Sequence, residues 1–297
     1  MATVRLGLSL IANMNLQPRQ IDVIGAYLEA PIKSEIYVKP PPGITISPGK
    51  VLKLDKALYG CRQAGQDFTK YWDTHIVDLG YTQSITEPSF FFRFKPSPIP
   101  NNPMLFDFGI WHTDDNFSGF SRLNNNDDND SQPKECVHEI GKHLPIEDKG
   151  IPKSYLGMSF GFKYQMAYAY QPGLIDDIVV AARMEHSKPI LTPLKFAYKI
   201  PTDGLGHEGF HNVSFPQILG AINFLTCCTR PDIANTIRVL SQFSANPPIQ
   251  VWKQLNNLVG YLKTMKDYVL TFGIKPPFLL RPPHPNNREN EDNMFTV

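Results

Sequence analysis

The 297-residue sequence contains few cysteines, and their spacing suggests no shared site. The four cysteines include no C-x-x-C pair, and two of them, Cys227 and Cys228, are adjacent. A disulfide framework or a structural zinc site is therefore not expected. A reducing compartment is the default for a chain with this cysteine usage.

Long apolar runs are also missing. The apolar runs that occur fall far short of the ~20 residues that a membrane-spanning helix needs. The first residues lack a basic region followed by an apolar one, which argues against secretion. We therefore expect an intracellular protein, cytoplasmic or nuclear, that has no membrane partner.

The sequence has almost no net charge. It contains 29 Lys and Arg against 28 Asp and Glu, for a net charge of +1. A free-standing nucleic-acid-binding protein normally has a clear basic excess, because neutralising phosphates supplies much of its affinity. The charge is also uneven, since residues 101–150 hold 4 basic and 10 acidic side chains between two mildly basic flanks.

What is abundant favours a folded chain with many irregular loops. Hydrophobic residues make up 42% of the sequence, enough to bury a core, and the length suits one large domain or two modest ones. The 27 prolines predict frequent interruptions of helices and strands.

Apolar spacing predicts a first half that mixes helices and strands and a second half that is mainly helical. The expected helices span residues 3–14, 65–79, 174–183, 215–227, 232–243 and 251–265. The expected strands span residues 20–27, 35–39, 51–54, 89–94, 104–111 and 116–120. Residues 121–134 are predicted to form a polar loop, and residues 274–297 a disordered tail.

Two acidic positions carry the candidate chemistry. Asp22 lies on a predicted strand, and the doublet Asp114-Asp115 lies in a turn between two others. If these strands are neighbours in one sheet, the carboxylates converge and require a divalent cation such as Mg²⁺. Two such ions can stabilise the attacking and leaving oxygens of a phosphoryl displacement. The pattern alone also fits an ordinary turn, where aspartate is common.

A series of sequence blocks resembles the reverse transcriptase of copia-type long-terminal-repeat retrotransposons. The blocks follow the order of that family from residue 3 to about residue 273. They are D-V-I-G-A-Y-L from Asp22, E-I-Y-V-K-P-P-P-G from Glu35, L-Y-G-C-R-Q-A-G from Leu58, E-D-K-G from Glu147, Y-L-G-M from Tyr155, K-P with T-P-L from Lys188, T-R-P-D-I-A from Thr229, and Y-L-K from Tyr261.

The resemblance implies an α+β fold. A polymerase palm, a small antiparallel sheet backed by helices, would be followed by a helical thumb or connection region. Residues 1–145 would form a truncated palm with partial fingers, residues 146–273 the thumb or connection, and residues 274–297 the tail.

The resemblance also implies RNA-directed DNA polymerisation by two-metal nucleotidyl transfer. Asp22 would be the first ligand of two Mg²⁺ ions, with the Val23 carbonyl as a further contact. Asp114 would be the second carboxylate ligand, with Asp115 beside it as the less essential acid. The partners would be an RNA or DNA template-primer, deoxynucleoside triphosphates, and the integrase and ribonuclease H segments of the same polyprotein.

Four further positions match the nucleotide-binding residues of that family. Tyr27 would place its ring beneath the incoming sugar and exclude a ribose 2′-hydroxyl. Gln63 and Gly65 would position the nascent base pair, and Arg62 would lie near phosphate. The residues themselves also fit an ordinary core aromatic and a plain turn before a helix.

Several features depart from the family pattern. His112-Thr113 replaces an aromatic residue and valine before the doublet, Asn116 replaces an apolar residue after it, and Asp107 lies in a normally apolar strand. Only 21 residues precede Asp22, and the expected ribonuclease H portion is missing. The alternative is therefore a truncated, degenerate retroelement remnant without catalysis, with at most weak nucleic-acid binding. A metal-dependent phosphatase has no supporting motif.

Overall fold

The computed structural model describes residues 1–97, 104–122, 131–142, 144–163, 165–194 and 214–273. Contacts between Cα atoms divide the chain into two compact units. We call Leu6–Pro152 the first unit, and Met1–Arg5 together with Lys153–Val297 the second unit.

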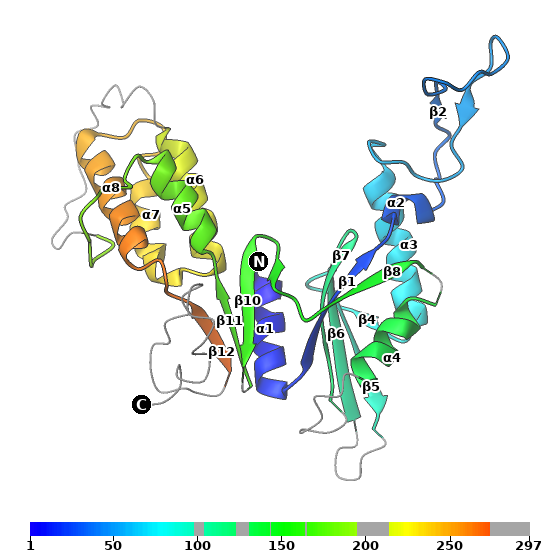
Figure 1. The fold of residues 1–297 in the computed structure, drawn as a ribbon, viewed down its shortest axis with the longest axis horizontal. Helices are drawn as coiled ribbons and strands as arrows, with labels where there is room; N and C mark the ends of the chain where they lie inside the picture. Colours follow the sequence, from blue (N-terminus) through cyan, green and yellow to red (C-terminus); the bar gives the residue numbers. More distant parts are fainter. Residues whose placement is uncertain (98–103, 123–130, 143, 164, 195–213, 274–297) are drawn as a thin grey trace. The chain divides into compact units, whose positions relative to one another are not determined.

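The first unit is built on a six-stranded antiparallel sheet with the strand order β4-β5-β6-β7-β1-β8 (Figure 1). Because β1 lies between β7 and β8, it joins segments that are far apart in the sequence. The strands are β1 (Gln17–Val23), β4 (Thr82–Gln83), β5 (Phe90–Pro96), β6 (Met104–His112), β7 (Asp115–Phe120) and β8 (Ile146–Gly150).

Helices cover both faces of this sheet. The helices α3 (Ala64–Asp78) and α4 (Ser131–Ile140) lie on one face (Figure 1) and share a core with the sheet. That core includes Ile21, Val23, Phe68, Trp72, Ile76, Phe91, Trp111, Phe120, Val137 and Ile140. On the other face, α1 (Ala2–Met14) approaches so closely that a Cβ on Gly7 would lie 2.9 Å from both Ile110 and Phe117.

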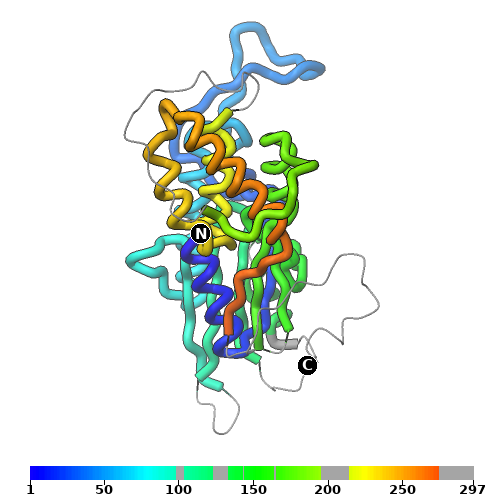
Figure 2. The backbone as a smooth tube through the Cα atoms, turned by 90° about the vertical axis from the view of Figure 1, so that its left-hand side faces the viewer, coloured from blue at the N-terminus to red at the C-terminus, as the bar shows by residue number. Residues whose placement is uncertain are grey.

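A small hairpin extends from the first unit. The short helix α2 (Ala26–Glu29) follows β1, and the strands β2 (Tyr37–Val38) and β3 (Leu52–Lys53) then pair with each other alone. This hairpin, drawn in blue, lies away from the six-stranded sheet in Figure 1 and at the top of Figure 2.

The second unit contains a helical cluster and a four-stranded antiparallel sheet of order β12-β11-β10-β9. Its strands are β9 (Ser154–Tyr155), β10 (Met158–Lys163), β11 (Met166–Tyr170) and β12 (Leu270–Gly273). Its helices are α5 (Pro172–Ala181), α6 (Phe215–Cys228), the 3₁₀ helix η1 (Pro231–Ile233), α7 (Ala234–Ser241) and α8 (Ile249–Thr264). The apolar faces of these helices form one buried core.

The predicted α+β class is confirmed, but some boundaries are wrong. The strand predicted over residues 20–27 begins earlier and ends at Val23. Gly25 adopts a left-handed conformation with φ of 62°, which stops the strand and starts α2. Glycine adopts this conformation at little steric cost.

Two further expectations differ from the structure. The loop predicted over residues 121–134 was wrong at its end, because α4 begins at Ser131. The polar start of α4 hides the helix, whereas Cys136, Val137 and Ile140 form its buried stripe. After residue 145 the expected helices are present, but the structure also contains the strands β8 to β12, which the sequence did not predict. The predicted tail over residues 274–297 lies outside the described residues.

A buried charge network connects β5, β6 and α4. The fully buried Asp107 lies opposite Arg93 in the β5–β6 register, and Arg93 Nη2 is 3.3 Å from its carboxylate. Lys95 Nζ lies 2.9 Å from the same carboxylate oxygen. Arg93 also donates to Glu139 of α4 at 3.0 Å. The acidic residue in β6 is therefore paired on its neighbouring strand.

A second network fixes the helical end of the second unit. The buried Arg230 donates through Nε and Nη2 to the two carboxylate oxygens of Asp232, at 3.0 and 2.8 Å. The Tyr261 hydroxyl donates to Asp232 at 2.8 Å. Burial alone raises the pKa of Asp232, but the hydrogen bond and charge of Arg230 and the bond from Tyr261 outweigh it, so the pKa is lowered.

We expect Asp107→Asn to destabilise the first unit by about 3 kcal/mol, because it leaves Arg93 buried beside a neutral partner. The matched control is Glu139→Gln. Glu139 contacts the same arginine but is 37% exposed, so its loss is expected to cost about 1 kcal/mol or less. Urea unfolding of the two variants tests the difference, and equal losses would contradict a buried role for Asp107.

We expect Asp232→Asn to cost about 2 kcal/mol at neutral pH, a figure reduced for its partly exposed carboxylate. A carboxylate whose pKa is lowered by folding contributes its full stability above its unfolded-state pKa of about 3.9. That contribution is lost as the pH falls through the folded-state pKa. The gap between wild type and variant should therefore shrink below about pH 4. Asp176→Asn, which breaks the exposed pair with Lys266, is the control and should have little effect. A gap that stays constant with pH contradicts this prediction.

Candidate active site

The pairing of β1 with β7 brings the predicted acidic residues together. Asp22 and Asp115 are partners in this register, and the Val23 amide donates to the Asp114 carbonyl at 2.9 Å. That bond makes Val23–Asp114 a hydrogen-bonded step, so Asp22–Asp115 is a non-hydrogen-bonded pair. In such pairs the Cα atoms lie about 4.5 Å apart and the side chains share a face.

Asp114 lies in the tight turn that joins β6 to β7. His112 and Asp115 are register partners, which leaves Thr113 and Asp114 as the two turn residues. Thr113 has a φ of 59°, a conformation that is unfavourable for a β-branched residue and usual for glycine in this type of turn. The turn therefore holds Asp114 at the end of the sheet at some cost in backbone strain.

Two polar side chains bind the paired carboxylates. Lys149 of β8 places Nζ 2.7 Å from Asp22 Oδ2. Gln20, two residues before Asp22 on the same face of β1, donates through Nε2 to Asp115 Oδ1 at 2.9 Å. Like charges directly opposite each other destabilise a sheet, so these contacts offset the repulsion between Asp22 and Asp115.

The pKa values of this cluster show its electrostatic coupling. Burial is the largest influence on Asp115 and raises its pKa. The neighbouring Asp22 and Asp114 charges add to the increase, and Gln20 and Lys149 oppose it. The pKa of Lys149 is raised mainly by its hydrogen bond to Asp22. The charges of the neighbouring residues therefore influence the protonation of both Asp115 and Lys149.

The donor atoms suit a divalent cation, although the side chains do not converge on one. Carboxylate and carbonyl oxygens, as at Asp22, Val23 and Asp114, are the hard ligands that Mg²⁺ prefers. Among the described residues, no group of three His, Cys, Asp or Glu side chains could hold a metal ion as arranged. Asp22 is instead directed toward Lys149, and Asp115 toward Gln20.

Tyr27 lies in an aromatic group between α2 and α3. Its ring centroid is 4.6 Å from that of Tyr59 and 6.1 Å from that of Phe68. A Cβ added to Gly65 would lie 3.8 Å from the Tyr27 hydroxyl, so these two predicted residues are neighbours. The pKa of the exposed Tyr59 is raised by burial first, and then by Asp114, Tyr27 and Asp22. The negative charges of Asp114 and Asp22 therefore act on Tyr59.

Arg62 and Gln63 lie at the start of α3. Gln63 is the N-terminal cap residue of this helix, although its side chain makes no capping hydrogen bond. Both side chains are exposed. The structure shows no direct bond between either residue and the carboxylates, so their predicted contacts with a nucleotide stay predictions.

Three residues of this region were missed in the sequence. Gln20 and Lys149 contact the carboxylates, and Tyr59 contacts Tyr27. Lys149 and Tyr59 lie within sequence blocks that match the family, but the spacing of residues in those blocks does not show which side chains they contact. Gln20 gives no signal, because its contact arises from the β1–β7 register.

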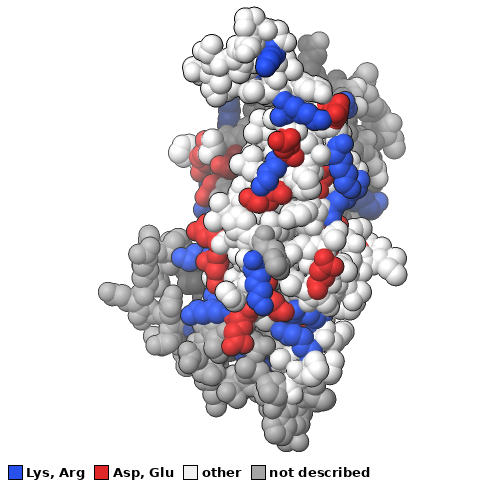
Figure 3. Space-filling model, turned by 90° about the vertical axis from the view of Figure 1, so that its right-hand side faces the viewer, with Lys and Arg blue, Asp and Glu red and all other residues white. Residues whose placement is uncertain are grey.

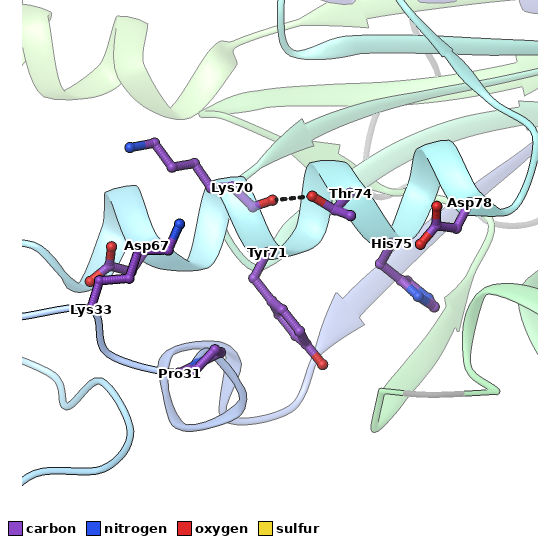
Figure 4. A pocket seen from close by; sticks show the side chains of 8 residues that line it. All are labelled: Pro31, Lys33, Asp67, Lys70, Tyr71, Thr74, His75 and Asp78. Atoms are coloured by element: carbon purple, nitrogen blue, oxygen red, sulfur yellow. Dashed lines mark hydrogen bonds between the residues drawn. The ribbon is translucent and has the colours of Figure 1, made fainter.

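A cavity of about 340 Å³ lies along α3, apart from these residues. Its lining residues are Pro31, Lys33, Asp67, Lys70, Tyr71, Thr74, His75 and Asp78 (Figure 4). Figure 4 shows Tyr71 and His75 pointing to the same side of the helix. No predicted site residue lines the cavity, so we do not include it in the candidate site.

Acidic and basic side chains are interspersed on the side of the molecule seen in Figure 3. Among the described residues in that view, neither sign of charge forms a broad patch of its own. Within the described part of the chain, no helix combines the length and apolar character needed to cross a bilayer.

Comparison with known proteins identifies relatives along most of the chain. A family model described as reverse transcriptase (RNA-dependent DNA polymerase) matches residues 1–195. The retrovirus-related Pol polyprotein from transposon TNT 1-94 of Nicotiana tabacum is 27% identical over 289 residues, which are 94% of this chain and 21% of that polyprotein. The corresponding polyprotein from transposon RE1 of Arabidopsis thaliana is 26% identical over 264 residues, or 88% and 17%.

A yeast relative matches a shorter segment. The Ty1-NL2 Gag-Pol polyprotein of Saccharomyces cerevisiae is 35% identical over 71 residues, which are 24% of this chain and 4% of that polyprotein. The chain spans about a fifth of the length of the plant polyproteins that it matches. No solved structure matches it. The family model covers well over half of the sequence, so the chain belongs to the reverse transcriptase (RNA-dependent DNA polymerase) family, in its copia-type retrotransposon branch.

Proposed function

We propose that this chain is the RNA-directed DNA polymerase segment of a retrotransposon Pol polyprotein. The observation that supports this most strongly is the β1–β7 register, which pairs Asp22 with Asp115 and places Asp114 in the adjoining turn. Acidic residues on two neighbouring strands can hold the cations that a phosphoryl transfer requires. The family match to residues 1–195 covers all of these positions.

The fold suggests a part for each region in this function. The six-stranded sheet with α3 and α4 would be the palm, and the β2–β3 hairpin would be the partial fingers. The helical cluster of the second unit would be the thumb or connection region. The proposed palm would then extend past the boundary predicted at residue 145, because β8 belongs to the six-stranded sheet.

Asp22, Asp114 and the Val23 carbonyl would hold two Mg²⁺ ions. When bound, the ions would supply charge neutralisation for the attack of a primer 3′-hydroxyl on the α-phosphate of a deoxynucleoside triphosphate, which breaks the bond to the β-phosphate and releases pyrophosphate. Phosphoryl transfer requires little covalent chemistry from the protein, so the residues of this chain would act by positioning the reactants. Asp115 would contribute negative charge beside the two ligands.

The incoming nucleotide would lie between the carboxylates and the aromatic group of Tyr27 and Tyr59. Tyr27 would lie beneath the sugar, where its packing against Tyr59 and Phe68 fixes the ring. Gln63 and Gly65 would contact the nascent base pair. Arg62 lies at the N-terminus of α3, where the helix dipole favours phosphate.

The proposed partners follow from the same assignment. They are an RNA or DNA template-primer, deoxynucleoside triphosphates, and the integrase and ribonuclease H segments of a Pol polyprotein. Support comes from the relatives, whose names describe Pol or Gag-Pol polyproteins.

A degenerate remnant without catalysis is the second candidate. It is favoured by one observation, that among the described residues no three potential ligands are arranged to hold a metal ion. In that case the chain would at most bind nucleic acid weakly.

Primer extension with Asp114→Asn separates the two candidates. With an RNA template, a DNA primer and Mg²⁺, we expect incorporation by the wild type and a loss of about 10²–10³-fold or more in the variant, because a charged ligand is removed. Asp78→Asn, which changes an exposed acid of α3 in the same unit, should leave incorporation unchanged. Wild-type incorporation no higher than that of Asp114→Asn rules out the polymerase.

Tyr27→Ala tests the proposed sugar contact. Without the ring, discrimination against ribonucleotides should fall about 10- to 200-fold. This is the range by which a pocket discriminates between substrates that differ by one small group, here the 2′-hydroxyl. Tyr27→Phe keeps the ring and should keep the selectivity. Both variants are compared by the ratio of kcat/KM for deoxy- and ribonucleotides, and an unchanged ratio in Tyr27→Ala argues against this position for the sugar.

A further inference from the structure

Lys149 owes its position to an irregularity in β8. In the β1–β8 pairing, Gln20 is opposite Gly150 and Ile21 is opposite Asp148, so Lys149 is the extra residue of a bulge. Bulges redirect side chains and are frequent beside active sites. Here the bulge directs the ammonium group of Lys149 onto the Asp22 carboxylate at 2.7 Å.

The bulge is held in place by its neighbours. The Gly150 amide donates to Asp148 Oδ1 at 2.9 Å, and Gly150 has a φ of 75° that favours glycine. Arg19 of β1 lies 3.6 Å from Asp148. The residues on both sides of Lys149 are thus held, Gly150 by Asp148 and Asp148 by Arg19 of β1, so the contact with Asp22 follows from the local fold of β8.

The lysine supplies the positive charge that this acidic cluster needs. Asp22 and Asp115 share a face of the sheet, with Asp114 beside them, and such a group is unfavourable without a counter-charge. Gln20, which donates to Asp115, is neutral. Lys149 also interacts electrostatically with Asp115 and Glu147, so its charge reaches beyond the single contact.

We propose that Lys149 is a resident counter-cation that a divalent metal ion displaces from Asp22. The bond occupies a carboxylate oxygen that metal coordination would use, and among the described residues no three ligand side chains are already arranged around a metal position. This inference rests on the proposed function, because it takes Asp22 as a metal ligand.

The solvent exposure of the pair makes the exchange feasible. The side chain of Asp22 is 28% exposed and that of Lys149 is 39% exposed, so water screens their attraction. Such exposed pairs are weak, and lysine carries its charge on a long flexible stem that can withdraw. A divalent cation has twice the charge and coordinates carboxylate oxygen directly, so it competes well for this position.

Metal binding without nucleic acid or nucleotide tests the inference. The full chain is titrated with Mn²⁺, the unbound ion is followed by electron paramagnetic resonance, and Mg²⁺ is then added as a competitor. Lys149→Gln should bind Mn²⁺ roughly two- to fivefold more tightly than the wild type, because it loses the competing cation. Lys149→Arg keeps the charge and should bind no more tightly than the wild type.

Two controls make the result specific. Lys53→Gln removes a lysine with the same 2.7 Å contact, made to Glu35 in the β2–β3 hairpin, and should leave Mn²⁺ affinity unchanged. In an Asp22→Asn background, Lys149→Gln should have no further effect, since the contested carboxylate is gone. Circular dichroism and thermal unfolding confirm that each variant is folded.

Each outcome has a defined meaning. Tighter binding by Lys149→Gln that disappears in the Asp22→Asn background supports the inference. Equal or weaker binding, or no binding by any folded variant, overturns it. Because the titration needs no polymerase activity, a chain that binds Mn²⁺ more tightly after Lys149→Gln but fails in primer extension keeps this inference and loses the proposed function.

Discussion

The pairing of β1 with β7 is the constraint on which the candidate site depends. Asp22 and Asp115 share a face because they are register partners, and a shift of one residue would send one carboxylate to the opposite face. The register is fixed by burial, since Ile21 and Val23 on the other face belong to the core beneath α3 and α4. The hydrophobic core therefore determines where the acidic residues lie.

Two of the departures from the family pattern, Asp107 and Asn116, have structural partners in this chain. Asp107 is buried but lies opposite Arg93 and near Lys95. Asn116, also buried, donates to the Ile110 carbonyl and accepts from the Ser118 hydroxyl. Burying a polar group costs free energy unless the group is paired, so the partners of Asp107 and Asn116 offset the cost of burying them in the sheet. The substitutions by themselves are thus weak support for loss of function, because a sequence drifting without constraint has no reason to keep both partners.

Periodicity predicted most of the fold, and the misses have physical causes. Helices such as α3 and α8 repeat apolar residues at helical spacing, so their existence could be read directly. The end of β1 depends on the left-handed Gly25, and α4 begins with polar residues whose helical state comes from burial of a later stripe. For the candidate site, the motifs predicted Asp22, Asp114 and Tyr27, and the roles of these residues stay predictions. The contacts of Gln20 and Lys149 arise from pairing between strands and from a bulge, which a linear pattern does not encode.

The same strand pairing explains why an acidic cluster is stable when no cation is bound to it. Sheet geometry that gathers carboxylates also raises the repulsion between them, and a fold must offset that repulsion before any ligand arrives. In this chain the positive charge of that offset comes from Lys149 of β8, a strand that follows β7 in the sequence but lies next to β1 in the sheet. A charged site and the group that neutralises it are therefore built by one continuous set of hydrogen bonds. Changing the register of β8 would alter the electrostatics of the acids without touching any of them.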